Sequence, residues 1–238
     1  LQQKRKGVKN MKILHLSDLH LGRRLYHHSF LPQQEKMLEQ VVKIAVEQSV
    51  QAVLIAGDVY DKNVPAAEAV TVLDSFLTAL SEKKIAVFLI SASQLLEHQG
   101  VYIAGTFSGE MQSYDLEDEY GKVHLCLLPF VKQAALSSLY PKENFRSLSD
   151  GIAHVIGQTA LSEKDRNLLM YHGFVLHDGT PPEESDSELQ LGGTQLVDAS
   201  VFDAFDYVAL GHIHKPQWVR SGKMRYSGSL MKYSFSET

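Results

Sequence analysis

Two patterns of apolar residues alternate along the first half of the chain. Runs of consecutive apolar residues indicate buried strands at Met11–Ser17, Ala52–Ala56 and Ile85–Ser91. Between these runs, apolar residues spaced three or four positions apart predict helices over Pro32–Gln48 and Ala66–Lys83. This order of strand, helix and strand implies parallel strands that are joined by right-handed crossovers.

The second half contains strands of the same kind but fewer helices. We expect one helix, over Leu148–Ala160, and a solvated loop over the acidic segment Asp178–Gly193. The expected strands are Lys122–Pro129, Asn167–His172, Tyr207–His212 and Met224–Gly228. The two halves together favour an α/β fold in which two packed sheets carry helices on their outer faces, an αββα sandwich.

Composition narrows the class of protein. The chain has 238 residues, of which 44% are hydrophobic and 21% charged, as is typical of a globular protein. The single cysteine, Cys126, lies in an apolar run, so we expect it to fill the core and favour a reducing, cytoplasmic setting. No apolar run approaches the ~20 residues that a membrane span needs, so we expect no membrane partner. The net charge of −5 argues against a protein that coats DNA non-specifically through phosphate neutralisation.

Six histidine and aspartate residues follow directly after expected strands. They are Asp18, His20, Asp58, His172, His212 and His214. In open α/β sheets, ligands bind beyond the carboxyl ends of the strands, where all six residues fall. Carboxylates and imidazoles together suit first-row metals, and two such ions ~3.5–4 Å apart can clamp both oxygens of a phosphoryl displacement. The pattern therefore predicts a hydrolase with two metal ions.

Alternate residues of an extended segment point the same way, so closely spaced ligands can share one ion. On this argument Asp18 and His20 hold a first metal, and His172 holds a second. Asp58 is the natural bridge between them, because it follows a central strand and Gly57 leaves room for the backbone. The spacing of His212 and His214 leaves two alternatives open, since both could serve either metal or each could serve one.

Three other histidines lie near this pattern, and we do not expect them to bind a metal. His15 lies inside the first strand, where we expect a buried histidine with satisfied hydrogen bonds. His27 and His28 follow in a polar loop, and we interpret them as surface residues.

Four motifs resemble those of the calcineurin-like metallophosphoesterases and occur in the order of that family. They are Asp18-Leu19-His20, Gly57-Asp58-Val59-Tyr60-Asp61, His172-Gly173-Phe174-Val175 and Gly211-His212-Ile213-His214. Longer stretches are similar to the bacterial SbcD family of DNA nucleases, among them 15–22, 101–105, 205–212 and 225–229. The resemblance covers essentially all of Met11–Thr238.

The resemblance implies a metal-dependent nuclease that cleaves DNA ends and hairpins in double-strand break repair and recombination. It implies two divalent ions, with manganese as the usual activating metal, and it implies DNA, an SbcC-type ATPase and a second copy of the chain as partners. It also implies that Asp18, His20 and His214 bind one ion, that His172 and His212 bind the other, and that Asp58 bridges both. We add Arg23, Arg24 and Lys215 as candidate DNA contacts, because they are basic and flank the ligand motifs.

The sequence departs from the family at one motif. The family has Gly-Asn-His-Asp after the third strand, where the asparagine binds the second metal and the histidine assists at the scissile phosphate. Here Ile85–Ser91 runs on into Ala92-Ser93-Gln94-Leu95-Leu96-Glu97-His98, so the catalytic residue is not identified. Either the natural protein carries further residues near Ser91–Ser93 that this sequence lacks, or the segment is deleted. We favour the first explanation, because the motifs on both sides fit an active enzyme.

The domain organisation follows from these observations. We expect residues 1–10, which are polar and basic, to be a cloning remnant or a disordered extension. We expect one metallophosphoesterase nuclease domain over 11–238 and a C-terminal capping domain that is absent from this chain. Two rival functions stay open, which are a phosphoesterase acting on a small molecule or a protein, and an inactive interaction module if the Gly-Asn-His-Asp segment is deleted.

Overall fold

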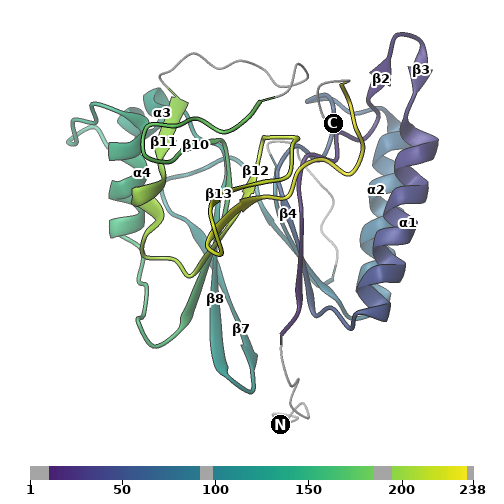
Figure 1. Cartoon of the computed structure of the whole chain (residues 1–238), viewed down its shortest axis with the longest axis horizontal. Coiled ribbons are helices and arrows are strands. Elements are labelled where there is room, and N and C mark those ends of the chain that lie inside the picture. Colours follow the sequence, from purple (N-terminus) through teal and green to yellow (C-terminus); the bar gives the residue numbers. More distant parts are fainter. Residues whose placement is uncertain (1–10, 92–98, 185–194, 235–238) are drawn as a thin grey trace.

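Two β-sheets lie face to face at the centre of the protein, and helices cover the outer face of each sheet (Figure 1). The computed structural model describes residues 11–91, 99–184 and 195–234. The expected extension over residues 1–10 therefore lies outside the described residues. The arrangement is that of an αββα sandwich, and it is consistent with the fold class predicted from the sequence.

The first sheet has four parallel strands in the order β1-β4-β5-β6. The strands are β1 (Ile13–Leu16), β4 (Ala52–Ala56), β5 (Ala86–Ile90) and β6 (Val101–Ala104). The connecting helices are α1 (Leu31–Glu47) and α2 (Ala67–Glu82). Each helix buries an apolar face, exemplified by Leu38 and Val41 on α1 and by Leu73 and Leu77 on α2, against the outer side of the sheet.

The second sheet has six strands in the order β13-β14-β12-β9-β8-β7, with the central four parallel and both edges antiparallel. The strands are β7 (Gln112–Asp118), β8 (Gly121–Leu128), β9 (Arg166–His172), β12 (Tyr207–Gly211), β13 (Gln217–Arg220) and β14 (Met224–Tyr226). Its outer side is covered by α3 (Gln133–Leu139), α4 (Leu148–Gly157) and the 3₁₀ helix η2 (Ala199–Phe202). The remaining strands are the hairpin β2 (Arg24–Leu25) with β3 (His28–Ser29) and the parallel pair β10 (Phe174–Leu176) with β11 (Leu196–Asp198).

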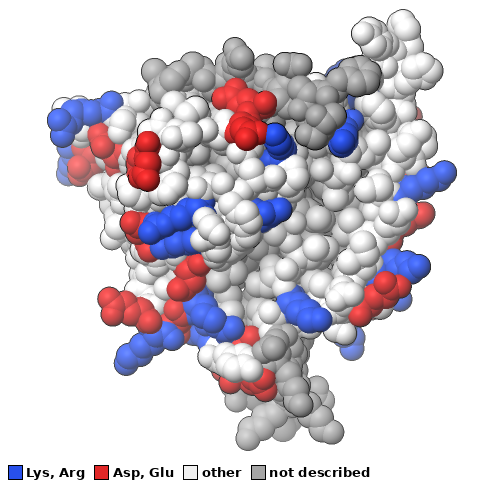
Figure 2. Space-filling view, viewed as in Figure 1, with Lys and Arg blue, Asp and Glu red and all other residues white. Residues whose placement is uncertain are grey.

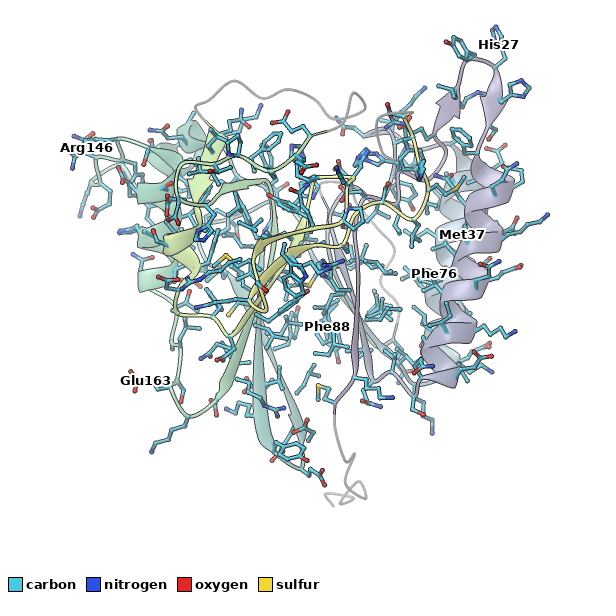
Figure 3. The ribbon with its side chains drawn as sticks, in the orientation of Figure 1. His27, Met37, Phe76, Phe88, Arg146 and Glu163 are labelled. Atoms are coloured by element: carbon cyan, nitrogen blue, oxygen red, sulfur yellow. The ribbon has the colours of Figure 1, made fainter. Side chains whose placement is uncertain are left out.

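The core between the sheets brings the carboxyl ends of the strands close together. Alternate residues of β4 divide between the two sides, because Val53 and Ile55 face the helices whereas Leu54 and Ala56 face the second sheet. Phe88 of β5 lies in the same layer between the sheets, as Figure 3 shows. Small residues permit the closest approach. The space for a Cβ at Gly211 is already taken, since that atom would lie 1.7 Å from the carbonyl oxygen of Ala56.

Most expected elements are present, with ends shifted by a few residues. The elements that were not predicted include the strands β6, β7 and β13 and the helix α3. β7 is an edge strand with exposed polar residues on one face, and α3 has only seven residues, so neither gives a strong apolar period. Cys126 is fully buried, as expected for a core residue. The part of the chain that the structure describes contains no helix that is both long and apolar enough to cross a membrane.

Candidate metal centre

The six predicted ligands meet at the carboxyl ends of β1, β4, β9 and β12, in two groups. The first cluster consists of Asp18, His20 and His214, and the second cluster consists of Asp58, His172 and His212. Within each cluster, the candidate ligand atoms lie within 4.8 Å of one another. For all of these residues but one this is the grouping that the resemblance implied, whereas Asp58 was expected as a bridge. The role of each residue as a metal ligand stays a prediction.

Backbone turns, rather than extended strands, aim four of these side chains, whereas His172 is the last residue of β9. The loop after β1 pairs with the loop after β4, because the amide of Asp18 donates to the carbonyl of Gly57 and the amide of His20 donates to that of Asp58, at 3.2 and 2.9 Å. Asp18, His20 and Asp58 have φ values of 54°, 43° and 44°, and His212 has a φ of 104°. Non-glycine residues seldom adopt positive φ, and such backbone strain is concentrated at functional sites.

This geometry corrects one step of the sequence argument. We expected closely spaced ligands to point to one place because they lie in an extended segment. Asp18 and His20 do share a cluster, but through left-handed turns. His212 and His214 point to different clusters, because the positive φ of His212 breaks the alternation between them. Of the two alternatives that the spacing left open, the structure has one histidine in each cluster.

Two glycines make room for His172. A Cβ on Gly57 would lie 2.1 Å from Nδ1 of His172, and a Cβ on Gly211 would lie 2.9 Å from the same atom. Gly57 also has a φ of 94°, which favours glycine. The room that the sequence predicted at Gly57 is therefore occupied by an imidazole ring of the second cluster.

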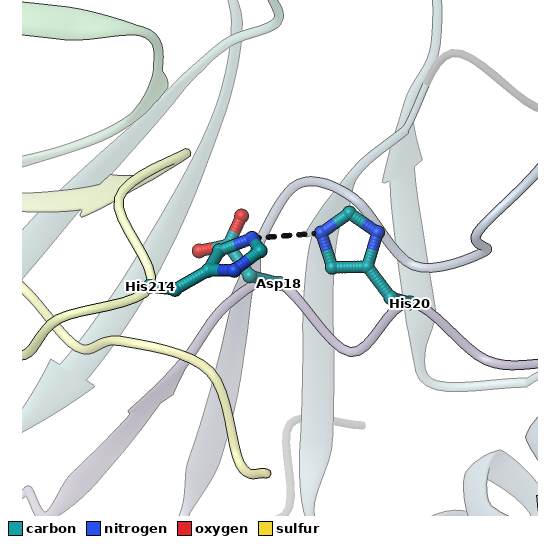
Figure 4. Close-up of side chains that lie close together, drawn as sticks. All are labelled: Asp18, His20 and His214. Atoms are coloured by element: carbon teal, nitrogen blue, oxygen red, sulfur yellow. Dashed lines mark hydrogen bonds between the residues drawn. The ribbon is translucent and has the colours of Figure 1, made fainter. Parts of the chain in front are cut away.

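The first cluster is enclosed. Asp18 is fully buried, and its two carboxylate oxygens accept from the backbone amide of His212 at 3.0 and 3.1 Å. The Nε2 atoms of His20 and His214 lie 3.0 Å apart (Figure 4). Two nitrogen ligands at right angles on one ion, each bonded at ~2.1 Å, would be separated by about 3 Å, so this spacing suits a shared metal.

Burial sets the charge of the first cluster. It raises the pKa of Asp18 to about 6. It lowers the pKa of His20 to about 4, although the carboxylate of Asp58 opposes that change. At neutral pH the Asp18 carboxylate is ionised and the His20 imidazole is neutral, and these are the forms in which the two side chains bind a metal ion.

Two residues that the sequence did not point to hold the first cluster in place. Gln34 of α1 is 3% exposed, and its amide donates to the carbonyls of Leu19 and His20 and to the hydroxyl of Tyr233, at 3.0, 2.8 and 3.0 Å. The Tyr233 hydroxyl donates to the carbonyl of Leu19 at 2.6 Å, and the ring lies edge-on to His20 with 5.6 Å between the ring centroids. No motif marks either residue, because their roles depend on contacts between distant segments.

The second cluster is more open. The Nδ1 of His172 is 2.9 Å from the carbonyl oxygen of Ala56, so Nδ1 carries the proton and Nε2 faces Asp58 at 3.5 Å. The side chain of Asp58 is 44% exposed. The Nε2 atom of His212 is buried and has no hydrogen-bond partner among the described residues. A buried nitrogen without a partner is costly, and a metal ion would satisfy it.

Asp58 and His172 perturb each other. Burial disfavours protonation of His172, but the carboxylate of Asp58 outweighs it and raises the pKa of His172 to about 9. Burial likewise acts to raise the pKa of Asp58, whereas His172 holds it well below its usual range. Burial lowers the pKa of His212 to about 3. Without a metal, the second cluster is therefore a paired imidazolium and carboxylate at neutral pH.

Asp58 lies between the two clusters. Its Oδ1 is 3.5 Å from Nε2 of His172, and its Oδ2 is 3.6 Å from Nε2 of His20. Each oxygen thus faces one cluster, as a bridging carboxylate requires. The donor set, the paired Nε2 atoms and the unpartnered His212 nitrogen all fit two divalent ions.

A cleft of about 430 Å³ opens beside the second cluster. Asp58, His172 and His212 line one side of it, and Asn63, Phe130 and Lys132 are among the residues that line the rest. Ser91 lies at the cleft too, so the expected Gly-Asn-His-Asp motif would enter from this end of β5. Residues 92–98 lie outside the described residues, and the structure does not test either explanation of the departure.

The three candidate DNA contacts differ in their surroundings. The guanidinium of Arg23 lies beside the first cluster, 4.9 Å from the centre of the Tyr233 ring. Arg24 lies on the exposed β2–β3 hairpin and donates to the carbonyl of His27. Lys215 forms an ion pair with Glu183, which was not expected. On the face shown in Figure 2, basic and acidic side chains are interspersed, in keeping with the net charge of −5.

The three histidines that we expected not to bind a metal behave as the sequence suggested. His15 is satisfied on both ring nitrogens, by the Tyr207 hydroxyl at 3.2 Å and the Leu210 carbonyl at 3.1 Å. His27 and His28 are exposed, and Figure 3 shows His27 at the tip of the β2–β3 hairpin.

The family comparison agrees with this geometry. Residues 11–91 match the model of the calcineurin-like phosphoesterases, and this segment includes Asp18, His20 and Asp58. The other three candidate ligands come from the second sheet, which completes the sandwich around the same point. The matched segment, the fold and the two clusters are consistent with a metallophosphoesterase, a class of metal-dependent phosphoester hydrolases.

Proposed function

We propose that this protein is a metal-dependent DNA nuclease of the SbcD type, which hydrolyses phosphodiester bonds at DNA ends and hairpins. The observation that carries the hydrolytic part is the position of Asp58, whose two oxygens face the two clusters at 3.5 and 3.6 Å. The SbcD-like motifs carry the choice of DNA, of manganese, of an SbcC-type ATPase and of a homodimer. The structure adds local support for a phosphate-bearing substrate.

Two divalent ions, when bound, supply Lewis-acid stabilisation of the charge that develops on the phosphoryl oxygens. The chain itself supplies a fixed frame for them. The carbonyl of Ala56 orients His172, and the amide of His212 orients Asp18. Asp58 lies between the two clusters, with one carboxylate oxygen facing each of them. Rigid placement of this kind lowers the cost of reorganisation during the reaction.

The cleft beside the second cluster suits a strand of nucleic acid. Lys132 can neutralise a phosphate, and Phe130 offers an aromatic surface to a base. Arg23 is placed to contact a phosphate on the side of the first cluster. Because the chain is acidic overall, we expect its affinity for DNA to arise at this cleft and to fall with salt.

The decisive experiment is cleavage of hairpin and linear duplex DNA with and without Mn²⁺. Asp58→Ala removes the bridge and should lower the rate by about 10³-fold or more, since loss of metal stabilisation is worth several kcal/mol. Asp203→Ala is the matched control, because Asp203 is an exposed carboxylate that pairs with Arg220 beyond the opposite end of β12. Metal-dependent cleavage that persists undiminished in Asp58→Ala would overturn the assignment.

Substrate distinguishes the nuclease from a phosphoesterase of another specificity. A nuclease should bind duplex DNA with salt-sensitive affinity and should cleave it faster than bis-p-nitrophenyl phosphate at equal concentration. Hydrolysis of the small ester alone would favour a small-molecule or protein phosphoesterase. Loss of both activities, with intact folding, would favour an interaction module. Peptide mapping of the natural protein tests whether residues near Ser91 are deleted, because a peptide that spans Ser91–Ser93 and contains further residues would reveal the additional segment.

A further inference from the structure

We propose that Asp61 is a positioning residue for the first cluster, where it accepts the Nδ1 proton of His20 and shares its carboxylate with Arg23. The inference rests on the proposed function in one respect, which is that His20 binds an ion through Nε2. It assigns a role to a carboxylate that belongs to neither cluster.

The Nδ1 nitrogen of His20, which points away from the cluster, needs a hydrogen-bond acceptor. Its Nε2 atom faces Nε2 of His214 at 3.0 Å and Oδ2 of Asp58 at 3.6 Å, so this is the atom that an ion would meet. A neutral imidazole that binds through Nε2 carries its proton on Nδ1. The Nδ1 atom of His20 is buried and has no hydrogen bond among the described residues. Buried N–H groups rarely stay without a partner, so the ring requires an acceptor here.

Asp61 faces this nitrogen. Its Oδ1 lies 4.0 Å from Nδ1 of His20, and its backbone amide is anchored to the carbonyl of Leu21 at 3.2 Å. The anchored backbone keeps the carboxylate beside the ring, and rotation of the side chain can shorten the distance to that of a hydrogen bond. The side chain is 21% exposed, so this rotation does not require the core to move.

Arg23 occupies the other side of the carboxylate. Its Nη1 lies 3.3 Å from Oδ1 of Asp61, and its guanidinium lies over the Tyr233 ring. The ring of Tyr233 in turn packs against His20. Asp61 therefore joins a metal-ligand candidate to a cation that is placed to contact substrate, and both sides of His20 are held by neighbours.

The second cluster shows what such a partner does. His172 has the carbonyl of Ala56 at 2.9 Å from its Nδ1, which fixes the ring and leaves Nε2 for the ion. Asp61 would do the same for His20, with a charged acceptor in place of a neutral one. Partners of this kind orient a ligating histidine and raise its basicity, and their loss typically weakens metal binding by ~10–100-fold.

The test compares Mn²⁺ binding by the full chain and its variants, measured by calorimetry and by electron paramagnetic resonance. Asp61→Ala should weaken binding at the first cluster by about 10–100-fold, and Asp61→Asn, which keeps an acceptor oxygen, should restore part of it. Arg23→Ala should leave Mn²⁺ binding nearly unchanged while it weakens binding to DNA. Asp203→Ala is the control for removal of a carboxylate from an exposed ion pair.

A second readout needs no metal. Nitrogen-15 resonances of His20 report which ring nitrogen carries the proton, and Asp61→Ala should shift that preference away from Nδ1 at pH 8. Equal Mn²⁺ affinity and an unchanged tautomer in Asp61→Ala would overturn the inference and would reduce Asp61 to the ion-pair partner of Arg23. Absence of Mn²⁺ binding in the unaltered protein would instead defeat the proposed function, so the two failures are distinguishable.

Discussion

The two clusters use similar residues but differ in how they are built. In the first cluster, Asp18 is fully buried and Gln34 and Tyr233 close the surrounding loops. In the second cluster, Asp58 is 44% exposed and a cleft of about 430 Å³ opens beside it. The enclosed cluster is suited to hold an ion, and the open cluster is where a substrate can approach one.

Their charges differ because burial and the Asp58 carboxylate act with different relative strength on the two histidines. At His20 burial outweighs the carboxylate and favours the neutral imidazole, whose pKa falls to about 4. The carboxylate of Asp58 favours the imidazolium of His172, whose pKa rises to about 9. The first cluster is therefore ready for an ion at neutral pH, whereas the second must release a proton to take one.

The largest effect is expected from Gly57→Ala. The new Cβ would lie 2.1 Å from Nδ1 of His172, so the ring must leave its position and the second cluster should lose its ion. We expect metal stoichiometry to fall from two to one and DNA cleavage to be lost. Gly109→Ala is the matched control, because Gly109 also has a positive φ, of 114°, but nothing lies within 4 Å of its Cβ. Two bound ions in Gly57→Ala would contradict this account of the second cluster.

The second-largest effect is expected from pH, because the metal affinities of the two clusters should depend on it differently. A ligating imidazole must be neutral, so an ion must displace the proton of His172 at any pH below about 9. Between pH 6.5 and 8.5 the apparent affinity of the second cluster should rise about tenfold per pH unit, since one proton is released. The first cluster should change little in this window, because Asp18 titrates near 6 and His20 near 4. Calorimetry in buffers of different ionisation enthalpy would measure the released proton, and equal slopes for both sites would refute the distinction.

The smallest effect is expected from Gln34→Leu, which tests the frame of the first cluster. Its side chain also accepts from the amide of Gly22 at 3.0 Å, so the change leaves several buried groups without partners. We expect a loss of about 1–3 kcal/mol in the free energy of unfolding and a weaker first site, with the second site retained. The neighbouring Gln33 is exposed, so Gln33→Leu is the control in chemical denaturation. Equal stability of the two variants would show that Gln34 does not hold these loops.

Much of the fold followed from apolar periodicity. The buried strands and the amphipathic helices have strong periods, and they are found where the sequence placed them. Weakly patterned elements such as β7 and α3 escaped prediction, because an exposed edge strand and a two-turn helix gain their stability from neighbours. The assignment of Lys215 as a candidate DNA contact could not anticipate its ion pair with Glu183, which depends on how two loops meet.

The sequence by itself determined which side chains are candidates for metal binding and that they follow the carboxyl ends of strands, because residue type and apolar period are local properties. Only the tertiary structure decided how these side chains are divided between the two clusters. The turn at His212 assigns it and His214 to different clusters, the two sheets approach closely enough at Ala56 and Gly211 to orient His172, and Gln34 reaches the loop from α1. These features depend on backbone torsion and on contacts between segments far apart in the chain, and a period of two or of 3.6 residues carries no information about either.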